Sequence, residues 1–306
     1  MIVNIDLEDR TWQIHLDGLL NILSQQSLHH RPSSMDNFGS LDLAIQICKS
    51  EGDVFRTLAT CEMNSLGKAF LILDVAKLCL RPLTAKVEKV LKGATSRKID
   101  VQKLRASIRQ IQKNLKFFPK VCPMAEFDID KVSSRDRLMN ALLLVRWNDY
   151  HCLQLITADL LLTTGSFLYS CQGYEVTRES SILSGTIYEA AESICSAVPA
   201  ILETEPIQMT DQSSESMKKP IRGLLVLWHL CCILKAPKLS QFQQDWIRET
   251  LWSIGNHAFI PQASALAISK GQNAEWTDVL AGLVLVRVAL SKELLGLFSE
   301  CGIVLQ

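Results

Sequence analysis

Apolar residues recur every three or four positions through most of the chain, which is the period of an α-helix. Alternating runs rich in Val, Thr and Tyr, bounded by the Asn-Gly or Asp-Gly turns typical of hairpins, do not occur. The chain is therefore predicted to be all-α, built of stacked antiparallel helices. The spacing predicts helices at Glu8–Ser27, Ser40–Leu58, Ser65–Leu91, Arg97–Lys116, Ser133–Ser170, Arg178–Pro199, Lys218–Leu234, Ser240–Ala258, Pro261–Ser269 and Trp276–Glu300.

Prolines and polar runs separate the predicted helices. Pro119 and Pro237 fall between helices, Pro82 predicts a kink within one, and Ser240 followed by Gln243 resembles a capping box. Residues 203–218, which are polar and rich in Ser, are expected to form a mobile loop. No repeat of about 33–45 residues is visible, so a solenoid is not expected. Residues 1–306 are predicted to form a single helical domain.

The composition is that of a globular protein with a sizeable core. Of 306 residues, 48% are hydrophobic, and this share excludes disorder. No uncharged apolar run reaches the roughly 18–20 residues that a membrane span needs. The first ten residues contain three acids and no apolar signal region, so a secretory signal is not expected. A cytoplasmic location is predicted, or a nuclear one if the protein is a regulator.

The ten cysteines do not predict a metal or redox site. No pair is spaced Cys-x-x-Cys, and none lies near histidines at zinc-ligand intervals. Free cysteine in an apolar helix behaves as a small hydrophobic residue. The glycine-rich nucleotide motifs, the Gly-x-Ser-x-Gly elbow, the His-Glu-x-x-His zinc motif and an Asp-rich metal motif are also missing. No cofactor and no metal are therefore expected.

Charge is balanced overall but uneven along the chain. Residues 77–120 carry thirteen Lys or Arg and only two acids, Glu88 and Asp100. Apolar residues recur along 101–115, and basic residues fall between them, which predicts an amphipathic helix with a basic outer face: Lys103, Arg105, Arg109, Lys113 and Lys116. Such a face attracts anions, but a solvated surface is the commoner meaning, and no aromatic residues interleave for base stacking.

Four segments, in this order and spacing, resemble one family. They are Trp12-x-x-His15-Leu16-x-Gly18, Arg146-Trp147-Asn148-Asp149-Tyr150-His151, the run from Ser193 to Pro199, and a last stretch from Gly223 through Trp228-His229 and Trp246-Ile247 to Ile260-Pro261-Gln262-Ala263. Together they are similar to the C-terminal regulatory domain of fungal zinc-cluster transcription factors. The resemblance spans nearly the whole chain. It implies an all-α, often dimeric fold that senses small molecules or partners.

The chain departs from that family in ways that bear on function. Only eleven residues precede Trp12, so the six-cysteine zinc cluster, the coiled coil and the first helices are not expected here. Trp228-His229 stands where the family has Trp-Pro. The chain is thus expected to be a stand-alone, shortened form without specific DNA binding of its own.

Two polar residues on apolar helices are the main candidates for a site. Asp149 falls on the apolar stripe of the helix from Arg135 onward, where a carboxylate must be paired, hydrated or neutral. Arg146, one turn back, is a structural partner for it, and a catalytic role is the alternative. His229 interrupts another apolar helix, where a lone histidine is more often satisfied by a neighbouring carbonyl.

These positions lead to a residue-level hypothesis. Tyr150, His151 and His229 are the candidate catalytic donors, and Trp147, Asp149 and Trp228 are the candidate ligand-binding residues. They are expected to face an apolar cavity walled by the helical stretches Arg135–Ser170 and Lys218–Leu234.

Two functions from different classes are open. The first is a cofactor-independent enzyme of fungal secondary metabolism, a cyclase, pericyclase or isomerase that folds an apolar metabolite in a shaped pocket. The second is a non-DNA-binding transcriptional co-regulator or ligand sensor that partners a zinc-cluster factor. A homodimer is left open, as is a purely structural scaffold.

Overall fold

The computed structural model describes residues 44, 65–92, 98–122, 134–172, 177–203, 215–237, 239–258, 260–269 and 275–284. Within these ranges every regular element is a helix, which confirms the all-α prediction for this part of the chain. The predicted helix Glu8–Ser27, all of Ser40–Leu58 except Ala44, the part of Trp276–Glu300 after residue 284, and the segment Trp12–Gly18 lie outside the described residues. So does most of the expected loop at 203–218.

The observed helix ends fall close to the predicted ones. The helices are α4 (Ser65–Leu91), α5 (Lys98–Leu115), α6 (Phe118–Val121), α7 (Ser134–Gln172), α8 (Thr177–Glu203), α9 (Glu215–Lys235), α10 (Gln241–His257) and α11 (Pro261–Ser269), followed by a helical segment at 276–284. The short α6 was not predicted. Helix α4 continues through Pro82. Ser240 caps α10 through the predicted capping box with Gln243.

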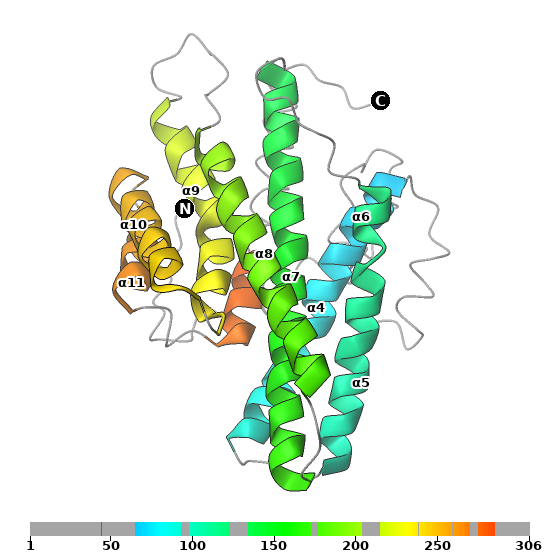
Figure 1. Ribbon diagram of the computed structural model, residues 1–306. Coiled ribbons are helices and arrows are strands. Elements are labelled where there is room, and N and C mark those ends of the chain that lie inside the picture. Colours follow the sequence, from blue (N-terminus) through cyan, green and yellow to red (C-terminus); the bar gives the residue numbers. More distant parts are fainter. Residues whose placement is uncertain are drawn as a thin grey trace, which may run out of the picture.

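The long helix α7 is the centre of the bundle. Helices α4 and α5 pack on one side of it, and α8 and α9 pack on the other (Figure 1). Helix α10 packs against α9, and α11 packs against α10. Between Val145 and Leu161 no residue of α7 is exposed. A helix surrounded in this way has no solvent face, so each polar side chain on it needs a partner inside the protein.

Two basic residues of the 77–120 stretch lie in the core. Lys77 is 1% exposed and Arg105 is 7% exposed. Arg105 donates to the backbone oxygen of Leu161 and forms an ion pair with Glu179 at 3.1 Å. The prediction that Arg105 belongs to the outer face was wrong, because this guanidinium finds a carbonyl and a carboxylate on α7 and α8. The other four predicted members, Lys103, Arg109, Lys113 and Lys116, are exposed.

Helix 276–284 packs closely against α9. A Cβ atom built on Gly282 would lie 2.0 Å from ring atom Cδ2 of Trp228, and Trp228 itself is buried. The absence of a side chain at this glycine therefore lets the indole lie directly on the helix backbone. No helix in the described part of the chain is long and apolar enough to cross a membrane.

The Gly282–Trp228 contact gives a prediction about packing. Gly282→Ala should destabilise the protein by about 1–3 kcal/mol, because the added methyl group must displace a buried indole. Gly185→Ala is the matched control, since a Cβ atom there meets nothing within 4 Å. That change should stabilise α8 by about 0.5–1 kcal/mol through helix propensity. Chemical denaturation of both variants measures the two effects; equal changes would contradict the described packing.

Candidate functional site

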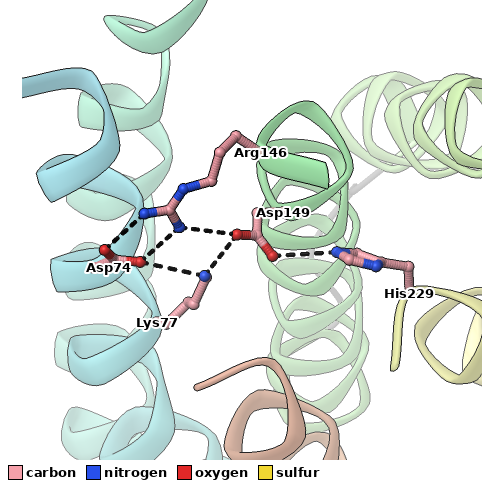
Figure 2. A network of polar contacts seen from close by, with 5 residues as sticks. All are labelled: Asp74, Lys77, Arg146, Asp149 and His229. Carbon is pink, nitrogen blue, oxygen red and sulfur yellow. Dashed lines mark hydrogen bonds and ion pairs between the residues drawn. The ribbon is translucent and has the colours of Figure 1, made fainter. Parts of the chain in front are cut away.

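A buried network of charged side chains joins α4, α7 and α9. Asp74 and Lys77 come from α4, Arg146 and Asp149 from α7, and His229 from α9 (Figure 2). All five are at most 5% exposed. On each of the first two helices the two members are three residues apart, so they lie on one face and reach toward the other helix.

Each of the two carboxylates contacts both of the two cations. Arg146 binds the Asp74 carboxylate with two parallel hydrogen bonds of 2.9 Å, the geometry that makes arginine–carboxylate pairs strong. The Lys77 ammonium bridges the two helices, at 2.7 Å from Asp149 Oδ2 and 3.3 Å from Asp74 Oδ1. Arg146 Nη1 also lies 3.1 Å from Asp149 Oδ2. The Asp149–Arg146 pairing that the helical spacing suggested is therefore present.

His229 completes the network from the opposite side of Asp149. Its Nε2 lies 3.1 Å from Asp149 Oδ1. An ionised carboxylate only accepts hydrogen bonds, so His229 Nε2 carries the proton and donates it. The other ring nitrogen, Nδ1, is buried and has no hydrogen-bond partner among the described residues.

The electrostatics keep this network ionised. Burial alone would raise the pKa of Asp149, but Lys77, His229 and Arg146 together hold it well below its usual range. Burial opposes the charge of Arg146 as well, yet Asp74 and Asp149 raise the pKa of that guanidinium. The two carboxylates of Asp74 and Asp149 thus balance the two cations, Lys77 and Arg146.

The neighbouring aromatic residues of α7 lie on its other side. Successive helical residues are about 100° apart, so Tyr150 and His151 point away from Asp149. Trp147 meets Phe118 of α6 at 5.1 Å between ring centroids, and Tyr150 stacks on the same ring at 5.3 Å. His151 packs against Trp147 and Tyr150 at 5.7 and 5.2 Å. Burial lowers the pKa of His151 to about 4 and raises that of Tyr150.

The structure thus divides the predicted site residues into three environments. Asp149 and His229 meet in the charge network. Trp147, Tyr150 and His151 form an aromatic cluster, and Trp228 packs on Gly282. The hypothesis missed Asp74 and Lys77. Their signal was present in the sequence: an acid and a base three residues apart inside the apolar run from Leu71 to Leu80.

The chemistry open to these groups is limited. Among the described residues no three His, Cys, Asp or Glu side chains are placed to hold a metal ion. A depression of about 200 Å³ lies elsewhere, lined by Leu162, Ser184, Ile187, Tyr188, Pro237 and Leu239. None of the predicted donors lines it. The charged groups of the network therefore contact one another, and none of them lines this depression.

No protein-family model, no curated protein and no solved structure matches this chain.

The first prediction for the network is a double-mutant cycle. Asp149→Asn leaves an excess buried positive charge and Lys77→Met an excess negative charge, so each should cost about 3–5 kcal/mol of stability. The double variant restores neutrality and keeps the Arg146–Asp74 pair. It should therefore cost less than the sum of the two by about 2 kcal/mol or more. Urea unfolding of the three variants measures this coupling.

The control for this cycle is the surface ion pair of α10. Asp245 lies 3.2 Å from Arg248, and its side chain is 51% exposed. Asp245→Asn should change the free energy of unfolding by less than about 1 kcal/mol. Additive costs in the cycle, or a surface change as large as the buried ones, would show that the network is not a coupled unit.

The second prediction concerns His151. Its pKa in the folded protein, about 4, is below the ordinary 6.5, so below pH 6.5 the unfolded chain takes up a proton that the folded chain refuses. Stability from His151 is present above pH 6.5 and is lost as the pH falls toward 4. Between pH 7.5 and 4.5 the wild type should lose about 2 kcal/mol more than His151→Phe.

The exposed His257 supplies the comparison for this experiment. His257→Gln should keep the wild-type loss of stability on acidification, measured by urea unfolding at each pH. If His151→Phe loses as much stability as the wild type, the imidazole is not held neutral by burial.

Proposed function

We propose that the chain is a non-catalytic regulatory domain, similar to that of fungal zinc-cluster factors, which recognises a ligand or a protein partner. One observation carries the proposal: among the described residues, the candidate donors of the sequence hypothesis contact neighbouring side chains of the core. Asp149 is bonded to two cations and to His229. His151 and Tyr150 belong to an aromatic cluster.

A catalytic donor must reach the atoms that react, within about 2.6–3.2 Å. In the network, His229 Nε2 is directed at Asp149, and the imidazole is 1% exposed. Presenting that proton to a substrate would require breaking a buried, charge-assisted hydrogen bond. A structural role for His229 is the simpler account, and it agrees with a regulatory domain whose helices are fixed in one arrangement.

Helices outside the charge network carry exposed side chains that a protein partner could contact. Phe242 and Trp252 of α10 and Ile268 of α11 are 80%, 51% and 72% exposed. These two helices form the outer layer beyond α9 (Figure 1). Aromatic side chains are enriched at protein interfaces, and tryptophan is among the residues that contribute most to binding there.

The second candidate, a cofactor-independent cyclase or isomerase, has one observation in its favour. The apolar depression of about 200 Å³ is lined by residues of α7, of α8 and of the connection between α9 and α10. It is large enough for a small apolar molecule, since a cavity of about 150 Å³ accepts benzene. The hydroxyl groups beside it belong to Ser184 and Tyr188. For an enzyme of this kind these two side chains would be the donors in place of His151 and His229.

If the chain is a regulatory domain, it should change transcription when it is brought to a promoter. Fused to an unrelated DNA-binding domain in a fungal reporter strain, the whole chain should change transcription at least threefold relative to that domain alone. Asp149→Ala, which breaks the buried network, should remove the effect, whereas the surface change Asp245→Asn should keep it. Reporter output equal to that of the DNA-binding domain alone, at equal protein level, would contradict the proposal.

A further inference from the structure

The outer side of α5 gathers cations with no acid among them. Residues 101–122 contain no Asp and no Glu. Within this range the exposed charged residues are Lys103, Arg109, Lys113, Lys116 and Lys120. Arg109 forms an ion pair with Glu179 at 2.8 Å. In the described part of the chain, the ammonium groups of the four lysines have no carboxylate that compensates their charge.

The helix that carries these cations is anchored on its inner side. Five apolar residues of α5 are buried there: Val101, Leu104, Ile108, Ile111 and Leu115. Arg105 lies between them, donates to the backbone oxygen of Leu161 and pairs with Glu179. Because these contacts hold α5 against α7 and α8, the backbone of the outer side has a fixed position, and the cations project from a rigid helix.

An exposed aromatic ring lies at the end of this basic side. Phe117, between α5 and α6, is 44% exposed. The next residue, Phe118, is 0% exposed and packs on two aromatic rings of α7. The burial of Phe118 therefore anchors the chain at the point where Phe117 reaches the surface. Lys116 comes directly before Phe117 and Lys120 follows three residues later, so the ring has cations on both sides in the sequence.

An anionic partner with an apolar side chain would match this surface. Like charges three or four residues apart on a helix repel each other, as Arg109 and Lys113 do within α5. A run of carboxylates on a partner offsets this repulsion, and a large apolar side chain beside them buries the ring of Phe117. A nucleic acid fits less well. Proteins that bind single strands provide several aromatic rings for base stacking, and a duplex backbone presents no apolar side chain to Phe117.

We propose that the outer side of α5 and the ring beside it dock an acidic segment of a protein partner that carries a large apolar side chain. This α5 surface consists of Lys103, Arg109, Lys113, Lys116, Phe117 and Lys120. It rests on the proposed function, which calls for a partner, and adds the chemistry of that partner. It is separate from the exposed residues of α10 and α11, which lie beyond α9 across α7 (Figure 1).

Fluorescence anisotropy of the whole chain with a synthetic acidic peptide tests the docking. The probe is a fluorescein-labelled peptide of about sixteen residues, all Glu except for one central Phe. It should bind, and raising NaCl from about 50 to about 300 mM should weaken the binding at least about tenfold, because exposed charges are screened. At the lower salt concentration, Lys113→Glu/Lys116→Glu should raise the Kd at least about tenfold.

The matched control makes the same change in net charge on another helix. Lys86 and Lys89 are exposed near the end of α4, and Figure 1 shows that end across α7 from α5. Lys86→Glu/Lys89→Glu should raise the Kd less than about threefold, since only the long-range field changes. Equal losses in the two double variants overturn the proposal, as does a wild type that does not bind the peptide.

The apolar contact is tested by a cycle between protein and peptide. Phe117→Ala should weaken the binding of the Phe peptide at least about threefold and leave nearly unchanged the binding of a peptide with Ser in place of Phe. Ile182→Ala is the control, because Ile182 is 63% exposed on α8, and it should change neither Kd. A Phe117→Ala variant that binds both peptides as the wild type does contradicts the apolar part of the proposal.

Two further outcomes are decisive. If a duplex DNA of about twenty base pairs binds through the same lysines and more tightly than the Phe peptide, the surface belongs to nucleic acid and the proposal is overturned. If Lys113→Glu/Lys116→Glu does not fold, the Phe117→Ala cycle decides. The reporter experiment measures transcription and not peptide binding. A chain that changes transcription but does not bind the peptide therefore overturns the docking surface and leaves the proposed function standing.

Discussion

The fold depends on how four buried charges are compensated between α4 and α7. Taking an isolated carboxylate or ammonium out of water costs several kcal/mol even after relaxation, so none of these groups is stable in the core alone. Each of them has partners of opposite charge within 3.3 Å. Because every member needs the others, the two helices have one arrangement that satisfies all four.

This requirement extends to α9 through Asp149. Lys77 and Arg146 occupy one carboxylate oxygen of Asp149, and His229 occupies the other. The residue before His229, Trp228, is packed on Gly282 of helix 276–284. Adjacent residues of α9 thus contact the charge network on one side and the last described helix on the other. The position of α9 is fixed by a polar contact and an apolar contact one residue apart.

Most of the helices could be predicted from the sequence, because they bury residues at the helical period. The ends of α4 and α11 coincide with the predictions, and the cap of α10 was visible as Ser240 and Gln243. The short α6 was missed because four residues are too few to show a period. The arrangement of the site was less accessible. Asp149 and His151 are only two residues apart, yet they point in different directions on the helix. The direction alone does not show which other helix each side chain will contact.

The same limit explains why the sequence analysis counted Lys77 only as one charge of the basic stretch 77–120. A lysine in a basic stretch is normally solvated, and only the placement of Asp149 on a helix distant in sequence makes its burial favourable. The position of Lys77 nevertheless carried information, since it is the one basic residue in the apolar run from Leu71 to Leu80, three residues after the only acid there. Replacing this ion-pair network with apolar residues would often leave stability unchanged or increase it. The network is therefore better explained by the single helix arrangement that it imposes than by the stability that it adds.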